Sequence, residues 1–138
     1  MRNLSFFMTT EQVRNKLKWV TRRFGWWFLK KGDLLQPVVK AQGLKKGEKI
    51  KKINGPIEVV SVRREPLNAI TKAECILEGF PDMEPVEFVE MLMTHYNCPP
   101  DAEVNRIEFK FWIHPIISTL CRKSLPLFGG KVNSHQVR

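Results

Sequence analysis

The chain has 138 residues and a formal net charge of +9, a length that fits one domain able to bury a core without disulfides or a metal ion. The longest late uncharged stretch, residues 111–121, is 11 residues long, whereas a membrane-spanning helix needs about 20. Glu11 interrupts the first apolar run, so we do not expect a secretory signal. We therefore expect a cytoplasmic protein without a membrane partner.

Positive charge is concentrated in the first half of the chain. Residues 1–64 hold 16 Lys and Arg against 4 acids, whereas residues 65–113 hold 3 Lys and Arg against 10 acids. A folded domain could present the first segment as one basic face. This distribution favours an anionic partner, of which nucleic acid is the commonest.

The three cysteines, Cys75, Cys98 and Cys121, are widely spaced and odd in number, which does not fit a disulfide framework. No His, Cys and Asp cluster has metal-ligand spacing, and no glycine-rich phosphate loop is present in the sequence. We therefore expect no metal and no cofactor.

Local patterns predict about five strands and three short helices. In chain order we expect a strand over 4–8, a helix over 10–17, an extended segment over 18–23, a strand over 34–41, a basic loop over 43–55, a strand over 57–63, a helix from 71 to 79, a helix from 84 to 97 and a strand over 104–113. The capping boxes Thr9–Gln12 and Thr71–Glu74 favour the first two helix starts. Because strands dominate, we predict an α+β fold: a small mixed β-barrel with short helical insertions.

The densest polar group lies in residues 16–23, which contain a threonine hydroxyl, two lysine amines and two arginines. Trp26 and Trp27 follow closely and offer flat surfaces for base stacking. A mixture of cations and aromatic rings suits single-stranded nucleic acid or a nucleoside. The alternative is a helix end with solvated charges and core tryptophans, and composition alone does not decide between them.

Several motifs in a fixed order resemble the ASCH domain family of PUA-like β-barrels. The matching segments are Lys18-x-x-Thr21-x-Arg23, Lys31-Gly32-Asp33, the strand from Pro56 to Val62, Glu78-Gly79-Phe80, Glu87-Phe88 and Arg106-Ile107-Glu108-Phe109. The sequence departs from the family at Lys16, where a glycine is usual, and it carries a lysine-rich insertion. The resemblance predicts an ASCH domain over residues 1–113, followed by a C-terminal extension or tail over residues 114–138.

This resemblance implies a barrel with a cleft near the signature and a partner that is RNA or a modified nucleoside. Similar small bacterial proteins hydrolyse the amide of N4-acetylcytidine, and others are reported as ribonucleases. Carried over by motif, the catalytic residues are Lys18, Thr21 and Glu78, although Glu74 and Glu84 lie close to Glu78 in the sequence.

The chemistry of this trio is coherent. A threonine hydroxyl needs an adjacent base, and a lysine serves as one when burial or nearby cations lower its pKa. Residues 18 and 21 face opposite sides of a regular strand. The pair therefore requires the chain to turn or bulge between them.

A non-catalytic RNA-binding module is the second hypothesis, and a ribonuclease is a weaker third because no histidine pair is apparent. Under the binding hypothesis the contacts come from Lys18, Arg22, Arg23, Trp19, Trp26, Lys31, Lys45, Lys46 and Lys49. His95 lies near a predicted helix C-terminus, where it more often interacts with the helix dipole than takes part in catalysis.

Overall fold

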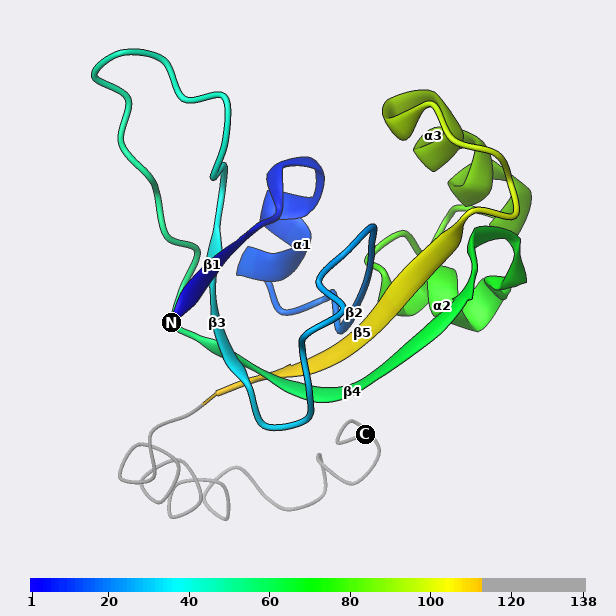
Figure 1. Ribbon diagram of the computed structural model, residues 1–138, viewed down its shortest axis with the longest axis horizontal. Helices are drawn as coiled ribbons and strands as arrows, with labels where there is room; N and C mark the ends of the chain where they lie inside the picture. The colour runs from blue at the N-terminus through cyan, green and yellow to red at the C-terminus, as the bar shows by residue number, and fades with distance from the viewer. Residues whose placement is uncertain (113–138) are drawn as a thin grey trace, which may run out of the picture.

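The computed structural model describes residues 1–112, which form a mixed α+β fold around one five-stranded sheet (Figure 1). The strands are β1 (Arg2–Ser5), β2 (Val20–Arg23), β3 (Leu34–Val38), β4 (Ile57–Pro66) and β5 (Glu103–Phe111). Their order in the sheet is β1-β3-β4-β5-β2, with β1 and β3 parallel and all other pairs antiparallel. The predicted α+β class is confirmed. The predicted tail over 114–138 lies outside the described residues.

Short helices connect the strands. They are the 3₁₀ turn η1 (Phe7–Thr9), α1 (Thr10–Arg14), the 3₁₀ turn η2 (Leu67–Ala69), α2 (Lys72–Leu77) and α3 (Pro85–Tyr96). In the described part of the chain, no helix has both the length and the apolar character needed to cross a membrane.

The long β4–β5 pair forms the spine of the sheet and curves from one end of the molecule to the other (Figure 1). Its sequences are rich in β-branched and aromatic residues, which favour strands. The register shifts between Val59 and Ser61, where a bulge bends the pair. Beyond the far end of β4, η2, α2 and α3 form a helical layer before the chain returns along β5.

The sheet is open and does not close into a barrel, so the predicted small mixed β-barrel is not confirmed. The edge strands β1 and β2 share no ladder within residues 1–112. They nevertheless come within one side chain of each other, because Arg23 Nη2 on β2 donates a 2.6 Å hydrogen bond to the Ser5 carbonyl on β1. The sheet therefore curls until a single gap separates its edges.

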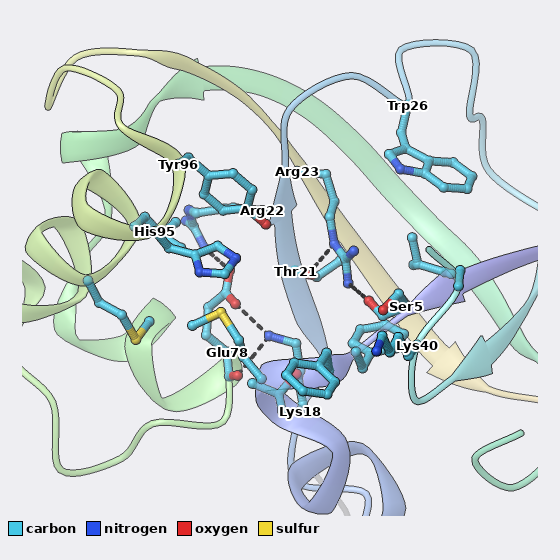
Figure 2. Close-up of a pocket in the computed structure, with 18 of the residues that line it drawn as sticks. Ser5, Lys18, Thr21, Arg22, Arg23, Trp26, Lys40, Glu78, His95 and Tyr96 are labelled. Atoms are coloured by element: carbon cyan, nitrogen blue, oxygen red, sulfur yellow. Dashed lines mark hydrogen bonds and ion pairs between the residues drawn. The ribbon is translucent and has the colours of Figure 1, made fainter. Parts of the chain in front are cut away.

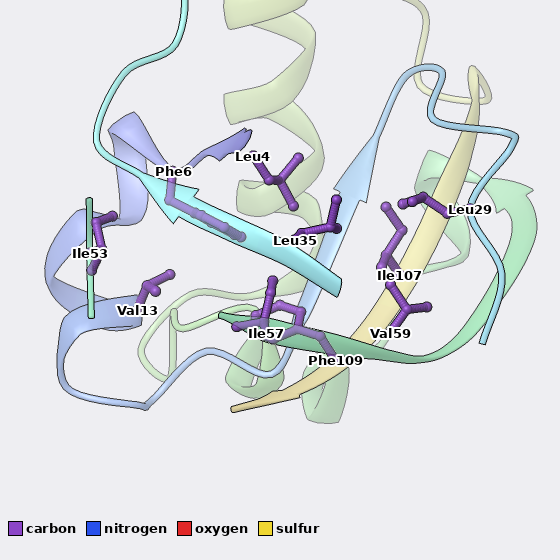
Figure 3. Close-up of a cluster of buried hydrophobic side chains, with 10 residues drawn as sticks. All are labelled: Leu4, Phe6, Val13, Leu29, Leu35, Ile53, Ile57, Val59, Ile107 and Phe109. Carbon is purple, nitrogen blue, oxygen red and sulfur yellow. The ribbon is translucent and has the colours of Figure 1, made fainter. Parts of the chain in front are cut away.

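Two apolar clusters hold this arrangement together. One lies inside the curled sheet and under α1 (Figure 3), and its buried members are Leu4, Phe6, Val13, Leu29, Leu35, Ile53, Ile57, Val59, Ile107 and Phe109. The other joins η2, α2 and α3 to the end of β5, and its buried members are Leu67, Ile70, Cys75, Phe88, Val89, Leu92 and Val104. Burial of these apolar side chains away from water stabilises both the sheet and the helical layer.

The first predicted elements differ in their limits. The strand expected over 4–8 ends at Ser5, and the helix expected over 10–17 ends at Arg14. Thr9 makes no capping hydrogen bond because it ends the η1 turn with φ −129° and ψ 32°, not the extended backbone usual for a cap. At α2, Thr71 Oγ1 does accept from the Glu74 backbone amide, as predicted.

Candidate functional site

A pocket of about 500 Å³ lies at the gap between the two edge strands. Side chains reach it from β1, β2, the end of α2 and one face of α3, and the segment just after β3 completes its rim (Figure 2). This size falls within the range of about 300–1,000 Å³ typical of small-molecule sites. Lys18, Thr21 and Glu78, the three residues predicted as catalytic, all line it.

Lys18 and Glu78 form a buried ion pair on one wall, and each is only 2% exposed. Lys18 Nζ donates to Glu78 Oε1 at 2.6 Å and to the Glu78 backbone carbonyl at 2.9 Å. Burial lowers the pKa of Lys18 below its ordinary value, with smaller contributions from Arg23 and Arg22, although Glu78 opposes this effect. The amine is therefore closer to its neutral form than a surface lysine.

The end of α2 places Glu78. This helix closes in a Schellman motif, in which Gly79 N donates to the Ile76 carbonyl and Phe80 N to the Cys75 carbonyl. Gly79 has φ +97°, and a Cβ there would lie 2.9 Å from the side chain of Gln12 on α1. A glycine is therefore required for two reasons. The sequence Glu-Gly encodes both the helix end and the direction of the carboxylate.

Thr21 lies on β2 beside Arg23, two residues away on the same face of the strand. Its hydroxyl oxygen accepts a 3.0 Å hydrogen bond from Arg23 Nε. Hydrogen bonding from a guanidinium favours the deprotonated form of a hydroxyl. The Arg23 guanidinium in turn lies over the Phe6 ring at 4.8 Å.

Lys18 reaches the same pocket as Thr21 because it lies outside the regular strand. β2 begins only at Val20, and the preceding turn contains Lys16 with φ +59°. This turn precedes Lys18, so it is not the turn between residues 18 and 21 that the sequence predicted; Lys18 instead enters the pocket from the irregular segment before β2. Within residues 1–112, no hydrogen bond joins Lys18 Nζ to Thr21 Oγ1, so their shared feature is the cavity between them (Figure 2).

A second layer of charges supports the first. Arg22 points away from Thr21 and binds Glu78 Oε2 at 3.0 Å, Glu65 at 2.8 Å and Glu74 at 2.9 Å. Burial opposes its charge, but these three carboxylates hold the pKa of Arg22 above its ordinary value. Two hydrogen bonds from Arg106 lower the pKa of Glu74 to about 2.

Glu74 shows how this network overrides local structure. The capping box predicted at Thr71 is only half formed, because the Glu74 carboxylate binds Arg106 and Arg22 and does not return to the helix start. Arg22 and Arg106 are directly opposite in the β2–β5 ladder, where like charges would otherwise repel. Glu74 removes that conflict and fixes α2 against the sheet.

Aromatic side chains form the remaining walls. Those that line the pocket are Phe6, Phe7, Trp26, Phe80, Phe88, His95 and Tyr96. Trp26 adopts φ +60°, a conformation unusual for a large side chain. The Asn105 side chain holds this turn by donating to the Trp26 carbonyl at 2.9 Å.

Several residues predicted as nucleic-acid contacts lie outside the pocket. Trp19 packs edge-on against the Phe111 ring at 5.0 Å and is 39% exposed. Lys31 lies in the exposed turn before β3. Lys45, Lys46 and Lys49 are exposed on the long loop that projects from the end of β3 (Figure 1). Arg22, Arg23 and Trp26 do line the pocket.

Sequence reasoning missed Lys40 and His95, both of which line the pocket. His95 completes a helical face with Phe88, Met91 and Leu92, the 3–4 spacing that turns side chains to one side. That spacing was the available signal. Nothing local identifies Lys40, because its position depends on the pairing of β3 with β1.

Within residues 1–112, no group of three or more His, Cys, Asp or Glu residues could hold a metal ion. Comparison with protein families and with curated proteins finds no match to this chain. Among solved structures, the chain is similar to protein EF3133 from Enterococcus faecalis V583, described by the family model DUF984. The TM-score is 0.53 at 14% sequence identity, and the match covers 76% of this chain and 67% of that chain. At this identity the likeness shows a shared fold.

Proposed function

We propose that this protein is an amidohydrolase that removes the acyl group from the N4 amine of an acylated cytidine. The observation that carries the proposal is a buried Lys18–Glu78 pair beside the Thr21 hydroxyl in one pocket. A base of lowered pKa, a hydroxyl oriented by a guanidinium and a carboxylate are the groups needed for acyl transfer.

In the proposed reaction, neutral Lys18 takes the proton of Thr21 as Oγ1 attacks the acyl carbonyl carbon. The C–N bond breaks, and protonated Lys18 returns the proton to the departing N4 amine of cytidine. Water then hydrolyses the acyl-threonine ester to give the carboxylic acid. Glu78 orients the lysine through the 2.6 Å hydrogen bond and stabilises its charged form between the two transfers.

The pocket suits a pyrimidine in size and in the character of its walls. Trp26 and Tyr96 provide aromatic surfaces near the polar trio, and aromatic side chains commonly stack on bases. A free amide without a ring would leave these walls unused. This supports a nucleobase amide over a simple aliphatic one.

The backbone also supports the proposed relationship to the ASCH domain and its PUA-like fold. Lys16 occupies the position where the family usually has glycine, and its φ of +59° is in the region that glycine favours. The close approach of β1 and β2 through Arg23 and Ser5 fits a barrel left open at one seam.

A non-catalytic RNA-binding module is the second candidate. The exposed lysines of the loop, among them Lys45, Lys46 and Lys49, support it, since they lie away from the pocket and are accessible to phosphates. A ribonuclease of the histidine-pair type has weaker support, because His95 is the one histidine in residues 1–112 and the described part of the chain therefore places no histidine pair in the pocket.

The test is incubation with N4-acetylcytidine, with cytidine release followed by chromatography. Thr21→Val should lower turnover by about 10³-fold or more, because it removes the nucleophile and nearly preserves shape. Thr21→Ser is the matched control, which keeps the hydroxyl and should retain measurable turnover. Equal rates for wild type and Thr21→Val would exclude the threonine mechanism.

A further inference from the structure

The pocket lining contains an excess of positive charge. Four of its residues are cationic, namely Lys18, Arg22, Arg23 and Lys40, whereas Glu78 is the single carboxylate. Glu78 is already bound to two of these cations, through Oε1 to Lys18 and through Oε2 to Arg22. Nothing in the lining therefore remains to balance the other two.

Arg23 has no ion pair within residues 1–112, although it is partly buried. Its Nε and Nη2 atoms donate to Thr21 Oγ1 and to the Ser5 carbonyl, both neutral acceptors. Its Nη1 makes no hydrogen bond among the described residues. Arg23 lines the pocket, and its Nη1 is not among the fully buried side-chain atoms without a partner, so this donor is not sealed off from a ligand.

Lys40 approaches the same part of the pocket. Ser5 links the two, since its carbonyl accepts from Arg23 and its hydroxyl donates to the carbonyl of Val39, the neighbour of Lys40. Figure 2 draws Lys40 and Arg23 on the Ser5 side, away from the Lys18–Glu78 pair. Lys40 Nζ is 3.7 Å from Glu48, a long and half-exposed pairing that leaves its donors available to a ligand.

We propose that Arg23 and Lys40 bind a phosphate group of the ligand, so that the substrate is a nucleotide and not a neutral nucleoside. This inference rests on the proposed function and specifies its substrate class. A guanidinium binds phosphate oxygens through paired N–H donors, and a lysine adds a point charge. A partly buried cation without a counter-ion destabilises the empty site, and a phosphate removes that penalty.

The proposed arrangement places recognition beside reaction. The phosphate binds at the Ser5 side through Arg23, and the acyl group binds between Thr21 and the Lys18–Glu78 pair. Burial lowers the pKa of Arg23, although Tyr96 and Glu78 oppose this. The guanidinium carries its charge at neutral pH with or without the phosphate. Because the same side chain donates to Thr21 Oγ1, one arginine joins the phosphate site to the nucleophile.

The binding test is calorimetric titration of the full-length protein with cytidine, with cytidine 5′- and 3′-monophosphates and with a short oligoribonucleotide, at low salt. We expect a phosphorylated ligand to bind at least about tenfold more tightly than cytidine, since charge-assisted hydrogen bonds are gained. A preference for one monophosphate identifies a free nucleotide as the source, and a preference for the oligoribonucleotide identifies RNA. Equal affinity for all four ligands would overturn the phosphate site.

Variants assign the effect to these residues. Lys40→Gln should weaken binding of the preferred phosphorylated ligand about tenfold while leaving cytidine binding unchanged. Lys110→Gln removes the same charge from the exposed face of β5 and should change neither affinity. Because Arg23 joins the two edge strands, Arg23→Gln is interpreted only together with its melting temperature. If Arg23→Gln unfolds, Lys40→Gln provides the test.

The hydrolysis assay distinguishes this inference from the proposed reaction. Faster turnover of N4-acetylcytidine monophosphate than of N4-acetylcytidine, measured as kcat/KM, supports both. Equal kcat/KM values contradict the phosphate site and leave the amidohydrolase intact. Tighter binding of phosphorylated ligands without any hydrolysis supports the phosphate site and contradicts the reaction.

Discussion

Two basic regions of this molecule lie in opposite environments, one in or beside the pocket and one exposed to solvent. The cations of residues 18–23 are held in or beside the pocket, where carboxylates or backbone carbonyls bind them. The loop over 43–55 projects from the end of β3 (Figure 1), and its lysines are exposed. Each lysine or arginine adds one positive charge to the first half of the chain, whichever of the two regions holds it. Only the loop acts as a basic surface.

The difference explains why positive and negative charge segregate along the sequence. Acids from the second half cross the fold to neutralise cations from the first, as the pairs Lys18–Glu78, Arg22–Glu74 and Arg64–Glu103 show. The excess of positive charge in residues 1–64 is therefore partly internal. A count of charges per segment does not predict the surface unless the pairing is known.

The largest expected effect comes from breaking the buried pair. Glu78→Gln should destabilise the fold by about 3–5 kcal/mol, because it leaves two buried cations with one carboxylate fewer. Glu103→Gln, which breaks the exposed pair with Arg64, should cost less than about 1 kcal/mol. Urea denaturation measures the unfolding free energy of both variants. Equal losses would contradict the distinction between the buried pair and the exposed pair.

The pH profile of hydrolysis reports Lys18 directly. The reactive form has a neutral amine, so kcat/KM should rise with pH through a pKa below the ordinary 10.5. The sign follows from burial, which disfavours the charged amine and moves the rising limb to lower pH. Lys18→Met should abolish the limb together with the activity. A limb at or above 10.5 would contradict a buried base.

Acid stability tests the second layer. The pKa of Glu74 is about 2 in the folded protein against an ordinary 4.5. Its contribution to stability is therefore complete above pH 4.5 and is lost as pH falls toward 2. Glu74→Gln should flatten the dependence of the unfolding free energy on pH in that window. Glu90→Gln, on an exposed residue without an ion pair among the described residues, should leave the slope unchanged.

The smallest expected effect on the fold comes from the loop. Replacing Lys45, Lys46 and Lys49 with glutamine should leave the melting temperature unchanged, since these residues are exposed and the replacement keeps the backbone. If the loop binds RNA, the salt dependence of affinity should fall by up to about 0.7 per lost phosphate contact. RNA binding insensitive to salt and to this replacement would remove the role of the loop.

Sequence patterns predicted the elements whose limits are set locally. Strand β4 follows its β-branched run, and α2 and α3 begin after Thr71 and at Pro85, where capping chemistry favours a helix start. The first strand ends early at Ser5, because the chain must enter η1 and bring Thr9 to the pocket. That choice depends on packing between distant residues and has no local signature.

The candidate site likewise contains residues that the sequence located and residues that it did not. Motif order located Lys18, Thr21 and Glu78, which the fold brings to one pocket. Motif order gave no sign of Lys40, and the sequence placed Trp19 beside Trp26 among the predicted nucleic-acid contacts without distinguishing them. The curl of the sheet decides between the tryptophans: Trp19 packs against Phe111, and Trp26 turns inward at its unusual φ. Curvature of this kind arises from the bulge in β4 and from long-range pairing.

The most direct measurement of the central claim is the covalent state of Thr21 during turnover. Wild-type protein is mixed with N4-acetylcytidine, quenched in acid within the first turnover and digested for mass spectrometry. The account predicts one added acetyl group on the peptide that contains Thr21, absent from Thr21→Val. Cytidine release without acetylated Thr21, or acetylation confined to the loop lysines, would contradict it.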